Sequence, residues 1–475
     1  MEKLFKLKQN GTTVKTEILA GLTTFMTMAY IIALNPNLLT NFGQSGGQAL
    51  WNGVFLATCL ASAVGTICMA FFANKPFAMA PGMGLNSFFF VVATNIAMIV
   101  GCEYLQAFQA GLCIIFVEGL VFILLSIFKI REKIVQAIPF GVRVAIAPSI
   151  GLMLLNIGFG SNVGIYTENG GPFYVFRDFF GALAPSVVKT NMGDSGYKVM
   201  VLTVITIFIG LFAMIALKHF NVKANVLLGM LISSIVYWVG QFILGSNPFA
   251  SLAGASFVPA FGDMAATTLF KFDFKTLFEI GWFSAVTLVI TFCMIDMFDT
   301  IGTLVGTASR ANMIDDSGNM PNIREALLSD AIGTVVGSAT GTSTVTTFIE
   351  SASGVEAGGR TGLTALTTGL LFLACIFLAP VAAIIPAAAT SAALIYVGIL
   401  MLSGLSKLNF DDVTQIVPAA IMLIGMPITS SIGHAIGLAL ISFTVIKLCT
   451  GKIKEVSWLT IVISLIFLAK FFIAV

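Results

Sequence analysis

The sequence predicts an all-α polytopic membrane protein, built as a seven-plus-seven inverted repeat of about 14 transmembrane spans. Of its 475 residues 57% are apolar and 10% are charged, whereas a soluble domain carries about 25% charged residues. The mean hydropathy is +0.99. Apolar segments near bilayer length follow one another along most of the chain, and short sequences of the first half recur in the second.

A helix that crosses the bilayer needs about 20 mostly apolar residues. Three of the expected spans, 84–101, 325–340 and 350–359, are too short to cross alone, which is typical of a transporter binding site. A further apolar segment at 456–474 has no counterpart in the repeat, and we expect it to cross the bilayer or to lie at its surface. The expected spans are 18–36, 51–73, 84–101, 106–128, 141–160, 199–217, 224–246, 283–304, 325–340, 350–359, 361–385, 388–404, 413–429 and 431–448.

The positive charges of the loops support this count. Clusters of Lys and Arg, including those at 3–15, 129–133 and 310–324, all fall on the side of the amino terminus, and the short opposite loops carry only Glu103. The longer loops at 161–198 and 247–282 have mixed charge. The positive-inside rule therefore predicts a cell (inner) membrane protein with a cytoplasmic amino terminus. Residues 1–17 lack the apolar core of a signal peptide, so we expect the first span to be retained.

Cysteine and histidine do not form a metal-binding pattern. The seven cysteines contain no C-x-x-C pair, and there are only two histidines. We therefore expect no metal and no cofactor. Because no basic cluster stands outside the loops, we expect the lipid bilayer and not a nucleic acid as partner.

Internal repetition predicts the symmetry. Ala63-Val-Gly-Thr66 resembles Ala331-Ile-Gly-Thr334, and Thr24-Phe25 resembles Thr291-Phe292, in the same order along the chain. Since seven spans is an odd number, a second copy would enter the bilayer from the opposite side. Such an inverted repeat is the architecture of many secondary transporters.

Two stretches in matching places predict extended backbone at the midplane. Residues 74–81 contain two prolines, and residues 342–349 are rich in β-branched side chains. We expect each to lead into a half-helix, with amino termini near Gly82 and Glu350 that offer backbone N–H groups to a ligand. Asn86, one turn into the first half-helix, can donate and accept hydrogen bonds. The alternative is an irregular segment whose polar groups are satisfied internally.

Carboxylates within apolar segments are the strongest functional candidates, because an acid in hydrocarbon is costly. Asp296 and Asp299 share one helix face, which Thr303 continues, and Glu350 opens the second half-helix. A buried acid can stay neutral until a partner arrives, and an ionised one can accept N–H bonds from a nucleobase edge. We expect Asp299 and Glu350 to bind substrate and carry protons. Asp296 is either a third proton carrier or a structural group, and Phe348 would pack against a flat ring.

Other acids favour a structural interpretation. Glu118 and Asp330 are expected to form hydrogen bonds between helices. Glu356 and Arg360, four residues apart on one helix, are expected to form an ion pair near its cytoplasmic end.

These residues resemble the nucleobase–cation symporters of the second type, in the branch of adenine/guanine/hypoxanthine permeases, over nearly the whole chain. The motifs are specific in combination. They are Ala20-Gly-Leu-Thr-Thr-Phe-Met-Thr-Met-Ala-Tyr30, Ala80-Pro-Gly-Met-Gly-Leu-Asn86, Asp296-Met-Phe-Asp-Thr-Ile-Gly302 and Gly341-Thr-Ser-Thr-Val-Thr-Thr-Phe-Ile-Glu-Ser-Ala-Ser-Gly354.

The resemblance implies a core domain at 18–128 and 283–385, a gate domain at 141–246 and 388–448, and a homodimer. It implies proton-coupled import of a purine nucleobase, with guanine or hypoxanthine as the first choice and adenine as the second.

It also implies roles for particular residues. The acids of the eighth and tenth spans would be Asp299 and Glu350, and Asn86 would lie near the substrate. Relatives for uracil and xanthine have Glu where this chain has Asp299, which would leave room for a bulkier purine. Some relatives have His where this chain has Thr303, so the proton relay would rest on the carboxylates.

Three rival functions stay open at this point. Sodium could replace the proton as coupling ion. An anion transporter of the same fold would need Arg or Lys at the midplane. An intramembrane aspartyl protease, the only enzyme among the three, would need a G-x-G-D signature, and Gly262-Asp263 lacks the first glycine.

Overall fold

The computed structural model describes residues 2–41, 43–127, 139–159, 185–252, 256–310, 313, 320–429 and 432–473. These residues form two compact units, and each unit takes segments from both halves of the sequence. Unit 1 consists of Met1–Pro139, Val258–Ala379 and Lys447–Val475, and unit 2 of Phe140–Phe257 and Pro380–Ile446. The assignment of core and gate roles to particular segments stays a prediction.

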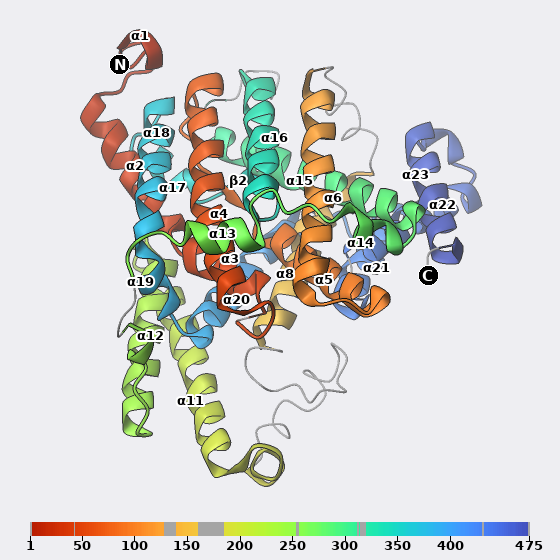
Figure 1. The fold of residues 1–475 in the computed structure, drawn as a ribbon. Helices are drawn as coiled ribbons and strands as arrows, with labels where there is room; N and C mark the ends of the chain where they lie inside the picture. The colour runs from red at the N-terminus through yellow and green to blue at the C-terminus, as the bar shows by residue number, and fades with distance from the viewer. Residues whose placement is uncertain are drawn as a thin grey trace. The chain divides into compact units, whose positions relative to one another are not determined.

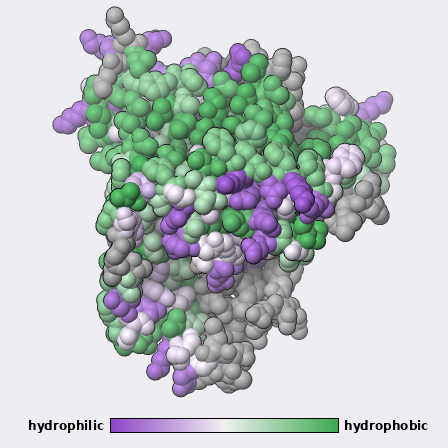
Figure 2. All heavy atoms as spheres, in the orientation of Figure 1, coloured by the Kyte–Doolittle hydropathy of each residue, from purple (hydrophilic) through white to green (hydrophobic). Residues whose placement is uncertain are grey.

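The described residues confirm a mostly helical, multi-pass membrane protein. Eight of their helices are long and apolar enough to cross a membrane, and five further apolar helices are shorter. In Figure 2 hydrophobic residues make up most of the face of unit 1 that is in view, whereas hydrophilic residues gather along the segment that carries α13 and α14. That segment is placed as expected for a boundary between lipid and water.

The helices of unit 1 come from both halves of the chain. The first half contributes α1 (Glu2–Phe5), α2 (Val14–Met28), α3 (Ile31–Leu39), α4 (Gly47–Cys68), the π-helical turn η1 (Met69–Ala73), β1 (Met79–Pro81), α5 (Met83–Val100) and α6 (Tyr104–Ile127). The second half contributes α13 (Phe261–Thr267), α14 (Phe274–Glu279), α15 (Trp282–Arg310), α16 (Ile323–Thr340), β2 (Val345–Thr347), α17 (Ser351–Glu356), α18 (Gly362–Ala374), η3 (Cys375–Leu378) and, at the carboxyl end, α23 (Trp458–Ile473).

Helices α18, α4, α16 and α6 pack side by side in unit 1 (Figure 1). The crossing of α4 and α16 needs glycine on both sides. A Cβ on Gly333 would lie 3.3 Å from Cα of Gly65 and 3.0 Å from Cγ1 of Val345. Small residues allow such close backbone approach, which stabilises helix pairs in a membrane through van der Waals contact. Gly65 and Gly333 occupy the same place in the two repeated tetrapeptides, so the two copies meet at equivalent residues.

The two predicted extended stretches pair with one another. Strands β1 and β2 are antiparallel, with Met79 opposite Thr347, Ala80 opposite Thr346 and Pro81 opposite Val345. Every residue of both strands is buried. Because extended backbone at membrane depth must satisfy its N–H and C=O groups inside the protein, each strand serves as the partner of the other.

Each strand is anchored by a threonine of the helix that precedes it. Thr66 Oγ1 donates to the carbonyl of Met79 at 3.1 Å and accepts from its N–H at 2.9 Å. Thr334 Oγ1 makes the same two bonds to Val345, at 3.2 and 3.3 Å. The same contact in both halves is what an inverted repeat requires, and it confirms the predicted fold class.

Four predicted segments differ in detail. The first span, predicted at 18–36, is broken at Ala29 and Tyr30 into α2 and α3. The second half-helix, predicted at 350–359, is only the six-residue α17, because Gly358 adopts a positive φ of 103°. The span at 361–385 divides into α18, η3 and α19 (Ala379–Ala383), and the loop at 247–282 contains α13 and α14.

Unit 2 contains α8 (Phe140–Phe159), α11 (Pro185–His219), α12 (Asn225–Ile243), η2 (Ala250–Leu252), α20 (Ala387–Met401), η4 (Leu402–Lys407), α21 (Val413–Thr429) and α22 (Ile432–Cys449). Helix α8 packs against α20 and α21, and α11 packs against α12 and α20. The basic residues at 129–133, much of the loop at 161–198 and the end of the segment at 456–474 lie outside the described residues.

Candidate functional site

The site in unit 1 is built around the end of strand β2. Residues 341–348 are buried, but Ile349 is 52% exposed and Glu350 is half-buried. Glu350 is the residue before α17, as the sequence predicts. Its carboxyl group therefore lies where the chain leaves the buried strand and turns toward an accessible surface.

Tyr30 holds the Glu350 side chain. Its hydroxyl donates to Oε1 of Glu350 at 2.7 Å, and the tyrosine is only 1% exposed. Tyr30 lies at the break between α2 and α3, so the break aims the phenol at the acid. Tyr30 was not among the predicted site residues. Its place at the end of the motif Ala20–Tyr30 was the available signal.

Asp299 lies on α15, which packs against both β2 and α17. A Cβ on Gly82 would lie 3.5 Å from Oδ2 of Asp299 and 2.4 Å from Cγ2 of Thr346. Gly82 precedes α5, an 18-residue helix. The carboxyl group of Asp299 therefore lies near the amino terminus of α5, where the helix dipole favours negative charge.

Thr303, a predicted substrate contact, is half-buried on α15. Its hydroxyl donates within its own helix, toward the carbonyls of Asp299 at 2.8 Å and Thr300 at 3.0 Å. A ligand would therefore find only the acceptor capacity of this hydroxyl.

The structure gives Asn86 contacts inside the protein. It is fully buried, its Nδ2 donates to the carbonyl of Pro81 at 3.2 Å, and its Oδ1 accepts from Ser343. Asn86 thereby joins the start of α5 to the segment before β2. Phe348 is 6% exposed, and its N–H extends the strand pair by donating to Ala78 at 3.0 Å. Substrate contacts for both residues stay predictions.

A second acidic cluster contacts β2 through the hydroxyl of Thr346. Asp296 and Asp330 are fully buried, and both approach the hydroxyl of Thr300. The predicted role of Asp330 as a partner between helices is confirmed, because it joins α16 to α15. Oε2 of Glu118 on α6 accepts from Thr344 at 2.9 Å, and Thr344 lies in the segment between α16 and β2 rather than on a helix, so the predicted bond between helices stays a prediction.

The predicted ion pair between Glu356 and Arg360 is wrong. Arg360 Nη1 donates instead to the carbonyls of Val355 at 2.7 Å and Gly359 at 2.8 Å. The carbonyl of Val355 also accepts from the N–H of Gly358 at 3.0 Å, so Arg360 adds a further hydrogen bond where α17 ends.

Glu17 has a role that the sequence did not reveal. It is fully buried, and its carboxylate accepts from the backbone N–H groups of Arg360 at 2.9 Å and Thr364 at 3.1 Å. It also accepts from the Thr364 hydroxyl at 2.6 Å. Glu17 therefore caps the amino terminus of α18 from another helix.

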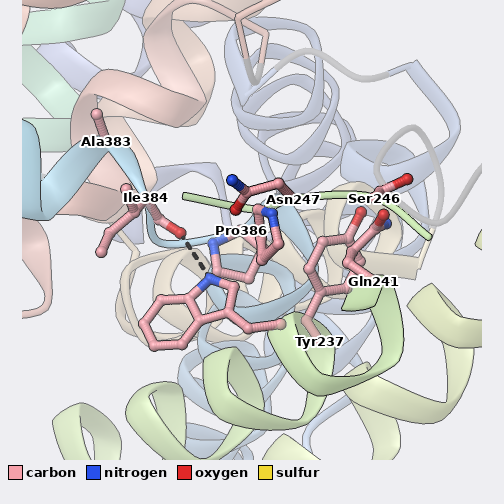
Figure 3. A pocket seen from close by; sticks show the side chains of 9 residues that line it. Tyr237, Gln241, Ser246, Asn247, Ala383, Ile384 and Pro386 are labelled. Atoms are coloured by element: carbon pink, nitrogen blue, oxygen red, sulfur yellow. Dashed lines mark hydrogen bonds between the residues drawn. The ribbon is translucent and has the colours of Figure 1, made fainter. Parts of the chain in front are cut away.

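A pocket of about 310 Å³ lies within unit 2 (Figure 3). It is lined by residues of α12, the segment after it and the segment before α20, among them Tyr237, Gln241 and Asn247. The indole N–H of Trp238 donates to the carbonyl of Ile384 at 3.1 Å. None of the predicted site residues lines this pocket.

A polytopic membrane fold in which the two halves of the chain contribute paired extended segments between helices is an architecture found in transporters. Residues 15–440 match the model for xanthine/uracil permeases, described as the Permease family. The chain belongs to this family, in agreement with the motif resemblance, and is a transporter rather than an enzyme.

Named relatives extend over almost its full length. The chain is 36% identical over 471 residues to Adenine permease AdeP of Escherichia coli strain K12, covering 99% of this chain and 95% of that protein. It is 36% identical over 490 residues to Guanine/hypoxanthine permease PbuO of Bacillus subtilis strain 168, covering 99% and 100%.

Among solved structures, the fold resembles the transmembrane domain of the cyanobacterial bicarbonate transporter BicA. The TM-score is 0.62 at 17% identity, covering 90% of this chain and 97% of that one. This likeness concerns the fold alone.

Proposed function

We propose that the chain imports a purine nucleobase together with protons. The observation that carries the proposal is the placement of two acids beside one strand pair, in a chain similar to adenine and guanine/hypoxanthine permeases over nearly its full length. Asp299 lies beside Gly82 and Thr346, and Glu350 follows three residues after β2.

Two carboxyl groups suit a purine because its ring N–H groups need acceptors. An ionised carboxylate can accept two such bonds, and charge-assisted bonds are about twice as strong as neutral ones. The backbone N–H groups in the first turn of α5, which follows Gly82, would serve the ring acceptors. Guanine or hypoxanthine is the first choice as substrate and adenine the second.

Proton coupling follows from the same acids. In the proposed cycle a proton enters at Asp299, Glu350 or both, and the purine then bridges the two acids. The core domain, 18–128 and 283–385, then moves so that the site opens inward, and purine and proton leave. The hydroxyl of Tyr30 keeps the Glu350 carboxyl in place while its protonation changes.

An anion as substrate is disfavoured by the residues beside the acids. The stretches 76–86 and 341–356 contain no Lys or Arg to attract one. Residence in the inner membrane, a cytoplasmic amino terminus and a homodimer belong to the proposal as well. Cysteine labelling from either side and light scattering in detergent would test them.

The test is uptake of radiolabelled guanine, hypoxanthine and adenine in competition, at two pH values and with sodium varied separately, on wild type and Asp299→Asn. We expect uptake to depend on pH and not on sodium, and Asp299→Asn to abolish that pH dependence. Normal transport by the variant with an unchanged pH profile would remove Asp299 from the coupling mechanism.

A further inference from the structure

The acidic cluster around the hydroxyl of Thr300 takes no part in the proposed substrate contacts. It consists of Asp296 and Thr300 on α15, Asp330 on α16 and Thr346 on β2. Oγ1 of Thr300 lies 3.0 Å from Oδ1 of Asp296 and 2.9 Å from Oδ1 of Asp330. Oγ1 of Thr346 lies 3.0 Å from Oγ1 of Thr300. One hydroxyl oxygen thus has three polar neighbours at hydrogen-bond distance.

The number of hydrogens in this cluster is limited. A threonine hydroxyl has one hydrogen and two lone pairs. If the Thr300 hydroxyl donates to one aspartate, the other aspartate must be protonated so that it can donate to a lone pair of Oγ1. If the Thr300 hydroxyl donates to Thr346 instead, both aspartates must be protonated. All arrangements that satisfy the three contacts therefore require at least one protonated aspartate.

Two ionised aspartates would not fit the surroundings. Both groups are fully buried, and like charges that share one site disfavour joint ionisation. The other acids facing this region are Asp299 on α15, Glu350 beyond β2 and Glu118 on α6. The elements packed against α16 on this side, namely α4, η1, α6 and β2, contain no Lys or Arg. Arg324, in the first turn of α16, is exposed and donates to the carbonyl of Ile127 at 3.4 Å.

We propose that Asp296 and Asp330 form a second protonation site, which holds one shared proton at Thr300 and thereby ties strand β2 to α15 and α16. Thr346 contacts the shared cluster through its hydroxyl and lies against Gly82 through its methyl group. Glu350 follows three residues after the strand. The shared proton thus positions the strand that leads to the substrate acid, and Thr300 is a positioning residue.

The infrared spectrum of the purified, substrate-free permease at neutral pH tests this directly. The readout is the carbonyl-stretch band of protonated carboxyl groups in wild type, Asp296→Asn, Asp330→Asn and the control Glu103→Gln, an exposed acid. An asparagine amide can donate to Thr300, so the remaining aspartate can ionise. We expect both Asn variants to lose the same component of the band and the control to keep it. An unchanged band in both variants, or a loss in only one of them, would overturn the shared proton.

Thr300→Val and Thr300→Ser provide a second readout in purine binding. Valine matches the shape of threonine and removes the hydroxyl, whereas serine keeps it. We expect Thr300→Val to weaken binding of radiolabelled hypoxanthine about tenfold, because the strand loses its tie to the aspartates. Thr300→Ser should retain the wild-type affinity. Wild-type affinity in Thr300→Val would contradict the positioning role of Thr300.

This inference goes beyond the proposed function, and the two fail in different ways. The infrared experiment uses no substrate, so it tests the second protonation site independently of the proposed substrate. Absence of hypoxanthine binding by the wild type, in contrast, would count against the proposed substrate.

Discussion

Replacing Tyr30 with phenylalanine removes one hydroxyl and little volume, so it isolates the bond that holds Glu350. Tyr30 Oη lies 2.7 Å from Oε1 of Glu350, and the residue is 1% exposed, so water cannot easily replace the donor. A hydrogen bond to a charged group contributes about 1.5–3 kcal/mol. Since about 1.4 kcal/mol corresponds to a factor of ten, we expect the apparent affinity for the purine to fall about 10- to 100-fold.

The assay is the initial rate of radiolabelled hypoxanthine uptake against concentration, in cells that lack their own purine permeases. Tyr104→Phe is a matched control. Its hydroxyl donates to the carbonyl of Leu39 at 2.6 Å, also in unit 1 but away from the acids. We expect Tyr104→Phe to transport with the wild-type KM at equal expression. Wild-type KM in Tyr30→Phe, or equal losses in both variants, would refute the role of Tyr30 in positioning Glu350.

Three further predictions concern neighbouring contacts. Gly82→Ala would place its Cβ 2.4 Å from Cγ2 of Thr346, and such overpacking costs about 1–3 kcal/mol. Because the start of α5 or strand β2 must then shift, we expect hypoxanthine uptake to fall about tenfold. Gly262→Ala, with no atom within 4 Å of its Cβ, should transport normally, and equal uptake by both variants would contradict the close approach at Gly82. Glu17→Gln removes the charge that caps α18 and should lower the unfolding free energy by about 1–3 kcal/mol. The measurement is the melting temperature in detergent, which should fall in this variant. The control Glu103→Gln, at an exposed acid, should keep the wild-type melting temperature. Arg360→Lys should weaken the side-chain bonds to the carbonyls of Val355 and Gly359 and lower the melting temperature more than Glu356→Gln does. The reverse order would contradict the role given to these bonds.

The sequence predicted the class of fold because its strongest signals are local. Apolar length indicates spans, prolines in 74–81 and β-branched residues in 342–349 indicate extended backbone, and the loop charges indicate orientation. The pairing of β1 with β2 could also be expected, since unpaired backbone is too costly at membrane depth. The anchoring by Thr66 and Thr334 then shows how the repeat is held together.

The parts that sequence reasoning missed depend on contacts between distant segments. Tyr30 and Glu350 are 320 residues apart, and Glu17 and Thr364 are 347 residues apart. No periodicity links such residues. Arg360 was assigned to Glu356 because helical spacing favours that pair. The helix ends before Arg360, so the side chain meets the terminal carbonyls instead.

Proton movement driven by a purine gradient tests the central claim most directly. The purified permease would be reconstituted into sodium-free liposomes that contain a pH-sensitive dye, and hypoxanthine would be added outside. We predict acidification of the interior that follows hypoxanthine uptake and is lost in Asp299→Asn. Uptake of hypoxanthine by the wild type without any change of internal pH would contradict proton coupling through these acids.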